Sequence, residues 1–225
     1  MLSLIQIIPI KFRDKYRSNW HEFKRELRIK LGQLKRQFIR PPFPKLKNGK
    51  VYLHLGCGSI SNLYFINIDG LPAPHIHYVR AIDNLTNFQS NSADLIYACH
   101  CLEHFPYAKV PKVLAEWFRV LKKGGILRLS VPDFDQLVNV YKESDNNMNK
   151  ILPFLMGGQD YRFNFHLAVF NRYSLEKMLI ETGFKQVQEW QPGSEPLTTF
   201  NDCSKLSTIV KEKKYNLSLN LEAFK

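Results

Sequence analysis

Two histidines and a carboxylate lie close together near the middle of this 225-residue chain, at His100, Glu103 and His104. They follow residues 93–99, an apolar run that predicts a buried strand. An imidazole can take up a proton near neutral pH, so His100 or His104 could serve as a general base. The alternative is that Glu103 or His104 only orients the loop or a neighbouring backbone group.

Cysteines flank His100, and cysteine and histidine are both zinc ligands. A single residue separates Cys99 from Cys101, however, and no second Cys/His pair of suitable spacing follows. On a strand, residues 99 and 101 share one face while His100 points to the other. We therefore predict small buried thiols and no metal.

The strands that must position these side chains come in an ordered series. Residues 51–55 predict a short buried strand, and Gly56 and Gly58 follow it at once, so the backbone can turn sharply and approach a ligand. Other apolar runs also end at carboxylates, namely residues 65–69, 78–83 and 126–133. Helical or loop stretches separate these strands, which indicates a parallel sheet with crossover connections.

The remaining elements follow from periodicity and stop signals. An amphipathic segment from residue 114 ends at Gly124 and Gly125, and Gly183 ends a helix over residues 173–182. Residues 134–141 predict another helix, and residues 145–159 an insertion or lid. Residues 185–191 and 216–224 predict two final strands.

Three of these segments together resemble the class I S-adenosylmethionine-dependent methyltransferases. They are residues 53–58 (Leu-His-Leu-Gly-Cys-Gly), 102–104 (Leu-Glu-His) and 119–125 (Arg-Val-Leu-Lys-Lys-Gly-Gly). The chain looks most like the small bacterial-type predicted enzymes (methyltransferase type 11-like) often encoded beside glycan-biosynthesis enzymes. The resemblance runs from about residue 51 to residue 225. It implies an α/β, Rossmann-like, doubly wound, mostly parallel sheet with a C-terminal antiparallel β-hairpin.

The resemblance implies S-adenosyl-L-methionine as the cofactor and assigns it to residues at the ends of predicted strands. These residues are His54, Gly56, Gly58, Asp69, Asp83, Asn84 and Leu85. The glycines would lie under the methionine and ribose, Asp69 at the ribose hydroxyls, and residues 83–85 beside the adenine. A carboxylate suits two hydroxyls because each of its oxygens accepts hydrogen bonds. The other interpretation of Asp69 is a simple Asp-Gly turn, and that of residues 83–84 a helix cap.

Two features depart from the family pattern. His54 stands where the wider superfamily usually has an acid before the glycine turn. Only 11 residues separate Gly58 from Asp69, about half the usual interval, so the first helix must be very short.

The same resemblance places the methyl group and the acceptor after the fourth strand. We expect His100 and His104 to line this reaction centre, with at most one of them acting as a base. Residues 157–166 would cover the acceptor, which Tyr161, Arg162 and His166 would contact; an ordinary surface loop with aromatic anchors is the alternative. The acceptor implied is a small molecule or a glycan, including cell-surface polysaccharide and lipid-linked sugar.

Charge divides the chain into two parts. Residues 1–48 hold 13 Lys/Arg and 3 Asp/Glu, whereas residues 49–225 hold 19 and 17, so most of the net charge of +12 lies in the first part. We predict a basic helical extension with a Pro-rich linker over residues 1–48, and one methyltransferase domain over residues 49–225. Four cysteines without a disulfide-like framework or a secretory signal before them indicate a cytoplasmic protein.

The extension contains an apolar stripe at helical spacing. Its members are Trp20, Phe23, Leu27, Leu31, Leu34 and Phe38. The other face carries Lys24, Arg25, Arg28, Lys35 and Arg36, and the prolines at 41, 42 and 44 end the helix. The stripe could pack on the catalytic domain, the use we favour, or lie on an anionic membrane at its inner face. Binding of nucleic acid or of a protein partner is the remaining alternative. The apolar residues 1–10 would aid the membrane use, but they are too few to span a bilayer.

Other functions remain to be weighed against the methyltransferase. A nicotinamide-dependent oxidoreductase is excluded, because Asp69 falls too early for its fingerprint and residues 102–104 have no role in it. A nucleic-acid methyltransferase lacks support, since residues 49–225 are almost neutral and carry no Asn/Asp-Pro-Pro-Tyr-type motif after the fourth strand. A binding protein that kept the cofactor fold without turnover stays open. So does the oligomeric state.

Overall fold

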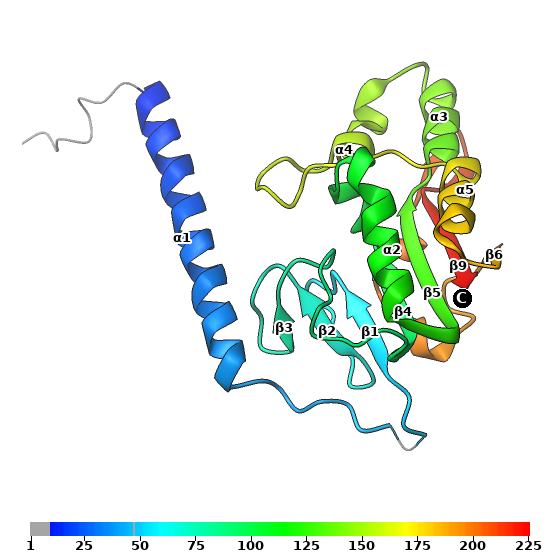
Figure 1. Cartoon of the computed structure of the whole chain (residues 1–225). Coiled ribbons are helices and arrows are strands. Elements are labelled where there is room, and N and C mark those ends of the chain that lie inside the picture. The colour runs from blue at the N-terminus through cyan, green and yellow to red at the C-terminus, as the bar shows by residue number, and fades with distance from the viewer. Residues whose placement is uncertain (1–9, 47) are drawn as a thin grey trace, which may run out of the picture.

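Seven of the strands in the computed structural model, which describes residues 10–46 and 48–225, form one mixed sheet (Figure 1). Their order is β3-β2-β1-β4-β5-β9-β6. The strands are β1 (Tyr52–Leu55), β2 (Ile66–Asp69), β3 (Tyr78–Val79), β4 (Ala93–Cys99), β5 (Leu121–Pro132), β6 (Gln186–Glu189) and β9 (Ser218–Phe224). The first five pair in parallel, while β9 is antiparallel to both β5 and β6. This arrangement confirms the predicted α/β Rossmann-like fold.

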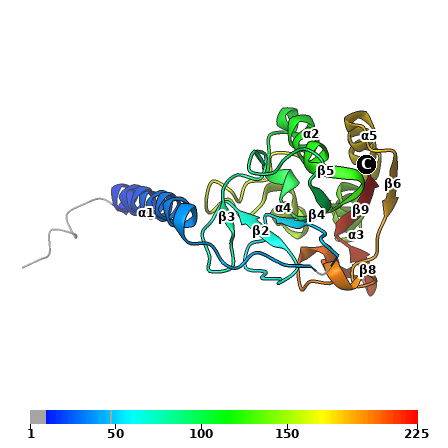
Figure 2. The same cartoon turned by 60° about the horizontal axis from the view of Figure 1, so that its bottom comes forward.

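Helices cover one face of the sheet. They are α2 (Val110–Val120) and α5 (Arg172–Thr182), which lie on the same side of the strands in Figure 2. Their apolar faces join Leu53, Leu55 and Ile96 in the main core, where Trp117 is completely buried. The α5 helix ends at Gly183 as predicted, because Gly183 has a left-handed backbone.

The opposite face is covered by irregular chain instead of crossover helices. Trp190 and Phe200 pack over Tyr52, Phe65 and Tyr97 and close a second, aromatic core there. The short first helix that we expected is absent, because all of the described residues 56–65 form turns or extended chain. Ten residues suffice for the turn and the return to β2, but they leave none for a helix.

Three further elements lie beside this sheet. The helices α3 (Phe134–Glu143) and α4 (Leu152–Met156) follow β5, and α4 falls within the predicted insertion. A two-stranded hairpin of β7 (Ser207–Val210) and β8 (Lys213–Asn216) precedes β9. The hairpin packs against α3 through buried Tyr215 and Leu137. The sequence did not predict it.

The N-terminal helix α1 (Ile10–Phe38) lies at the β3 edge of the sheet (Figure 2). Ile29 is buried against Cys57, Ile76 and Val79. A Cβ on Gly32 would lie 2.5 Å from Cβ of Pro72, so only glycine permits this close approach. The helix therefore docks through a face that carries few apolar residues.

The apolar stripe over residues 20–38, from here on the α1 stripe, points away from this contact. Its six side chains are between 46% and 80% exposed. The favoured prediction, that the stripe packs on the catalytic domain, is therefore wrong. The predicted segment of residues 1–10 lies outside the described residues except for Ile10. Within residues 10–46 and 48–225, no helix combines the length and the apolarity that a bilayer crossing demands.

Candidate functional site

A glycine turn follows β1 and forms one wall of a cleft. Gly56 and Gly58 have positive φ angles of 61° and 54°, the left-handed region that glycine adopts without strain. A Cβ on Gly56 would lie 2.8 Å from Cβ of Cys101, whereas one on Gly58 would meet no atom within 4 Å. The first glycine thus permits close packing of two strand ends, and the second leaves space open at the cleft.

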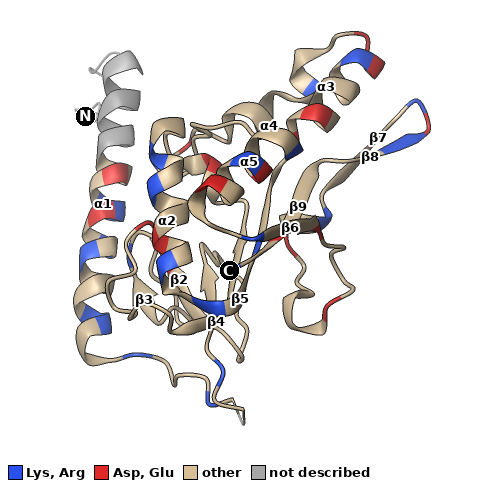
Figure 3. Cartoon of the chain, turned by 45° about the vertical axis from the view of Figure 1, so that its right-hand side comes forward, with Lys and Arg blue, Asp and Glu red and all other residues tan. Residues whose placement is uncertain are grey.

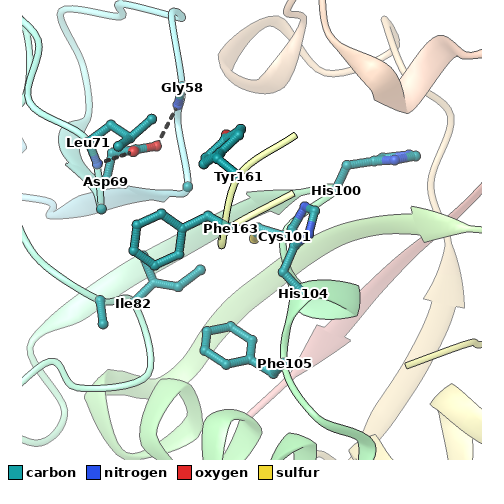
Figure 4. A pocket seen from close by; sticks show the side chains of 13 residues that line it. Gly58, Asp69, Leu71, Ile82, His100, Cys101, His104, Phe105, Tyr161 and Phe163 are labelled. Carbon is teal, nitrogen blue, oxygen red and sulfur yellow. Dashed lines mark hydrogen bonds between the residues drawn. The ribbon is translucent and has the colours of Figure 1, made fainter. Parts of the chain in front are cut away.

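Asp69, at the end of β2, holds this turn in place. The Gly58 N–H donates to its Oδ2 (2.8 Å), and the Leu71 N–H donates to its Oδ1 (2.7 Å), as the dashed lines in Figure 4 show. Each carboxylate oxygen can still accept a further hydrogen bond. Asp69 is therefore a turn residue and also a lining residue of the cleft, and its contact with the ribose hydroxyls stays a prediction.

The cleft has a volume of about 240 Å³ and lies beyond the carboxyl ends of β1, β2 and β4. Its walls are mainly apolar, formed by Leu71, Ile82, Phe105 and Phe163 (Figure 4). Sequence reasoning missed these four residues. For Leu71 and Phe105 a signal existed, because each is the first or second large apolar residue after a predicted strand end.

The segment expected beside the adenine lies just outside the lining. Asp83 forms an ion pair with Lys109. The Asn84 side-chain oxygen accepts from the Arg80 guanidinium at 2.8 Å. Leu85 is buried in the core. The cleft is lined instead by the preceding Ile82, whose carbonyl accepts from the Trp117 indole at 2.8 Å.

His54 does not line the cleft. Its ring is 1% exposed and stacks on Phe200, with 5.1 Å between the centroids, inside the aromatic core. Burial lowers the pKa of His54 to about 4, opposed by the nearby charge of Asp202 and aided by that of His75. The alternation of a strand explains this place, since Leu53 and Leu55 point to the helix-covered face.

Acidification is expected to destabilise the protein through His54. The unfolded chain takes up a proton below about pH 6.5, whereas folded His54 resists protonation down to about pH 4, so stability falls across that window. Between pH 7 and pH 5 this group alone removes about 2 kcal/mol. Urea unfolding at both pH values measures the loss, and His54→Phe, which keeps an aromatic ring, should reduce it; an unchanged pH dependence would contradict the assignment.

His100 lines the cleft with a strained backbone, at φ 48°. The Ser218 hydroxyl donates to the Cys203 carbonyl (2.6 Å) and accepts from His100 Nε2 (2.8 Å). Nδ1 therefore keeps its lone pair and lies 3.4 Å from Oε1 of Glu103. Burial lowers the pKa of His100 to about 4, so the ring is neutral at pH 7 and this contact is no ion pair.

His104 and Glu103 stand on a single 3-10 turn (Leu102–His104) after β4. His104 lines the cleft, and burial lowers the pKa of its ring. Glu103 is 1% exposed, and burial raises the pKa of its carboxyl to about 8. The structure thus brings both predicted histidines to the cleft, with the carboxyl directly behind them.

The three residues predicted to contact the methyl acceptor lie in different places. Tyr161 lines the cleft, but Arg162 turns outward to pair with Glu26 of α1 at 2.6 Å. His166 lies behind the lining, with its ring 4.9 Å from that of His104. The chain after it is fixed because the Leu167 and Ala168 N–H groups both donate to the Glu103 carbonyl.

A scan of family models matches residues 66–129 to a methyltransferase domain. This stretch runs from β2 into β5 and contains Asp69, His100, Glu103 and His104. A search of curated proteins gives no match.

The solved structures found to be similar have low sequence identity to this chain. An S-adenosylmethionine-dependent methyltransferase of Archaeoglobus fulgidus is 16% identical, covers 89% of this chain and 94% of its own, and has a TM-score of 0.47. A possible histamine N-methyltransferase of Thermotoga maritima is also 16% identical. The match covers 96% of this chain and 97% of that protein, with a TM-score of 0.48. An S-adenosylmethionine-dependent methyltransferase of Methanosarcina mazei is 19% identical. The match covers 80% of this chain and 94% of that protein, with a TM-score of 0.47. The family match covers β2 and β4, two of the strands that end at the cleft, so this chain contains an S-adenosylmethionine-dependent methyltransferase domain.

Proposed function

We propose that this methyltransferase acts on a glycan or another small molecule presented at an anionic membrane surface. S-adenosylmethionine supplies an electrophilic methyl group, so the chain needs only to hold the cofactor and align an acceptor with it. The cleft suits that cofactor: Asp69 has acceptor capacity left for hydroxyls, Gly58 leaves open space, and Leu71 and Ile82 offer apolar walls for a base. The acceptor would approach past His104 and Tyr161.

The exposed α1 stripe is the observation that carries this proposal. Six large apolar side chains stand in solvent along one helix face. Exposed Lys24, Arg28 and Lys35 border the stripe on one side and Lys30 on the other. Lys and Arg recur along the described part of α1, which also carries the acidic Glu22 and Glu26 (Figure 3). An apolar face with a cationic border matches an anionic lipid surface, which takes up the apolar side chains and attracts the charges.

The other face of α1 connects this surface to the cleft. The Arg25 guanidinium lies over the Tyr161 ring at 4.5 Å, and Glu26 pairs with Arg162. Tyr161 lines the cleft, so one helix would contact lipid on one side and hold the acceptor loop on the other. This geometry favours an acceptor that is itself anchored to lipid. The free cysteines agree with the inner, reducing side of the membrane.

Vesicle co-sedimentation tests the membrane location. We expect the full chain to bind anionic phospholipid vesicles at low salt, less at physiological salt, and neutral phosphatidylcholine vesicles weakly at both. Replacing Leu27 and Leu31 together by serine should weaken anionic binding about 30-fold or more, because two leucines lose roughly 2 kcal/mol or more of apolar burial.

Matched control variants lie outside α1. Leu63→Ser and Ile180→Ser also remove exposed apolar side chains, so they should bind as the wild type does. The membrane location is contradicted if the control variants lose as much vesicle binding as the α1 variant. It is also contradicted if the wild type does not bind anionic vesicles at either salt concentration. Labelled cofactor incubated with fractionated cell extract tests the acceptor: label should enter a lipid or glycan fraction, and label in nucleic acid would overturn the proposed substrate class.

A further inference from the structure

A group of possible metal ligands lies directly behind the cleft. Glu103, His104 and His166 offer one ligand atom each, and these atoms lie within 4.8 Å of one another. The Glu103 carboxylate is buried, and neither of its oxygens has a hydrogen-bond partner among the described residues. A buried polar group without a partner is costly, so this pair of oxygens implies something that the protein itself does not supply.

The histidines cannot satisfy that carboxylate while they are neutral. Nδ1 of His104 lies 3.0 Å from the Phe165 carbonyl, and Nδ1 of His166 lies 2.7 Å from the Phe154 carbonyl. A carbonyl only accepts, so each Nδ1 carries the proton and each Nε2 is left with a bare lone pair. Nε2 of His166 lies 4.0 Å from Oε1 of Glu103, which is also an acceptor.

His100 directs a third nitrogen lone pair toward the same carboxylate. Its Nε2 is committed to the Ser218 hydroxyl, so the atom that lies 3.4 Å from Oε1 of Glu103 is the unprotonated Nδ1. When Glu103 is ionised, acceptors therefore face acceptors here, and the described residues place no donor between them. A single proton on Glu103 would serve one of these lone pairs and leave the others unserved.

We propose that Glu103, His104 and His166 bind a divalent first-row transition metal ion. Two imidazoles and one carboxylate are a ligand set used for Zn²⁺ and its neighbours, and they leave a coordination position open. The backbone carbonyls on the two Nδ1 atoms orient both rings in the manner usual for metal-bound histidines. Ligand atoms around such an ion are about 3.3 Å apart, so small side-chain rotations would close the group.

The position of the site connects it to the acceptor. His104 belongs both to this group and to the wall of the cleft. A bound ion there would act as a Lewis acid on an acceptor hydroxyl and favour loss of its proton before it takes the methyl group. That role rests on the proposed function, whereas ion binding itself does not.

Metal titration of the full chain tests the site. Protein stripped with a chelator is titrated with Zn²⁺ against a chromogenic competitor, and Co²⁺ is used as a spectroscopic probe. We expect one equivalent of tight binding, with Co²⁺ bands that report nitrogen and oxygen ligands. Glu103→Gln, which keeps the side-chain shape, and His166→Ala should each weaken binding 10-fold to 100-fold or more. His21→Ala, an exposed histidine on α1, should change nothing.

Several outcomes overturn the site. The first is that the wild type binds less than one equivalent of metal. The second is that the variants keep both the circular dichroism and the metal affinity of the wild type. A stability gain in Glu103→Gln without metal binding by the wild type would identify a protonated carboxyl instead. Titration with S-adenosylhomocysteine in the same samples separates the two proposals, since cofactor binding can fail while metal binding persists, and the reverse.

Discussion

S-adenosylhomocysteine is expected to bind the Asp69→Ala variant 10-fold to 100-fold more weakly than the wild type. The carboxylate accepts from the Gly58 and Leu71 N–H groups, so its removal loosens the glycine turn as well as deleting the acceptor for the ribose hydroxyls. Each hydrogen bond to a charged group contributes about 1.5–3 kcal/mol, and every 1.4 kcal/mol is tenfold in affinity. Isothermal titration calorimetry on the folded variant measures the change.

Two further variants make this result interpretable. Asp69→Asn keeps one acceptor oxygen and should lose less than Asp69→Ala. Asp145→Ala removes an exposed carboxylate that pairs with Lys211, away from the cleft, and should bind normally. An affinity for Asp69→Ala equal to that of the wild type would remove Asp69 from the cofactor site.

Gly56→Ala is expected to lower the free energy of unfolding by roughly 2–5 kcal/mol. A non-glycine residue at φ 61° costs about 1–3 kcal/mol of backbone strain. The new Cβ would also lie 2.8 Å from the Cys101 side chain, and overpacking of this kind costs about 1–3 kcal/mol more. Urea denaturation monitored by fluorescence gives the difference.

Gly58→Ala serves as the matched comparison, because it has a similar φ and open space around its Cβ. It should show the strain cost alone and therefore lose less stability than Gly56→Ala. If both variants lose the same amount, the contact between the glycine turn and Cys101 does not determine stability.

Much of the sheet could be predicted, since apolar runs and strand-end carboxylates repeat in the order of the fold. The final strands β6 and β9 and the helix that Gly183 ends are confirmed. The β7–β8 hairpin was not predicted, because its strands have mostly exposed or half-exposed side chains and a charged turn. The missing crossover helix could be suspected only from the short interval before Asp69.

The site was harder to predict than the fold, for physical reasons. The resemblance assigned His54 to the cofactor from its position before the glycine turn, but the alternation of β1 turns its ring into the aromatic core. For α1, the most apolar face was the natural candidate for packing. The helix docks instead through Ile29, a glycine against Pro72, and Arg36, which donates to the Ala73 and Pro74 carbonyls. Such contacts depend on matching shape and leave no periodic pattern.

The irregular cover on the second face of the sheet has a consequence for synthesis of the chain. Phe200 stacks on His54, and Asp202 accepts from the Tyr97 hydroxyl at 2.6 Å. The members of these pairs are separated by about 150 and by 105 positions, respectively, and together they complete one core. At a translation rate of about 5–20 residues per second, the ribosome needs on the order of 10 s between them. During that interval the aromatic side of β1 and β4 has no partner and is open to chaperones. The nascent chain must therefore complete this core late, after most of the strands have already been made.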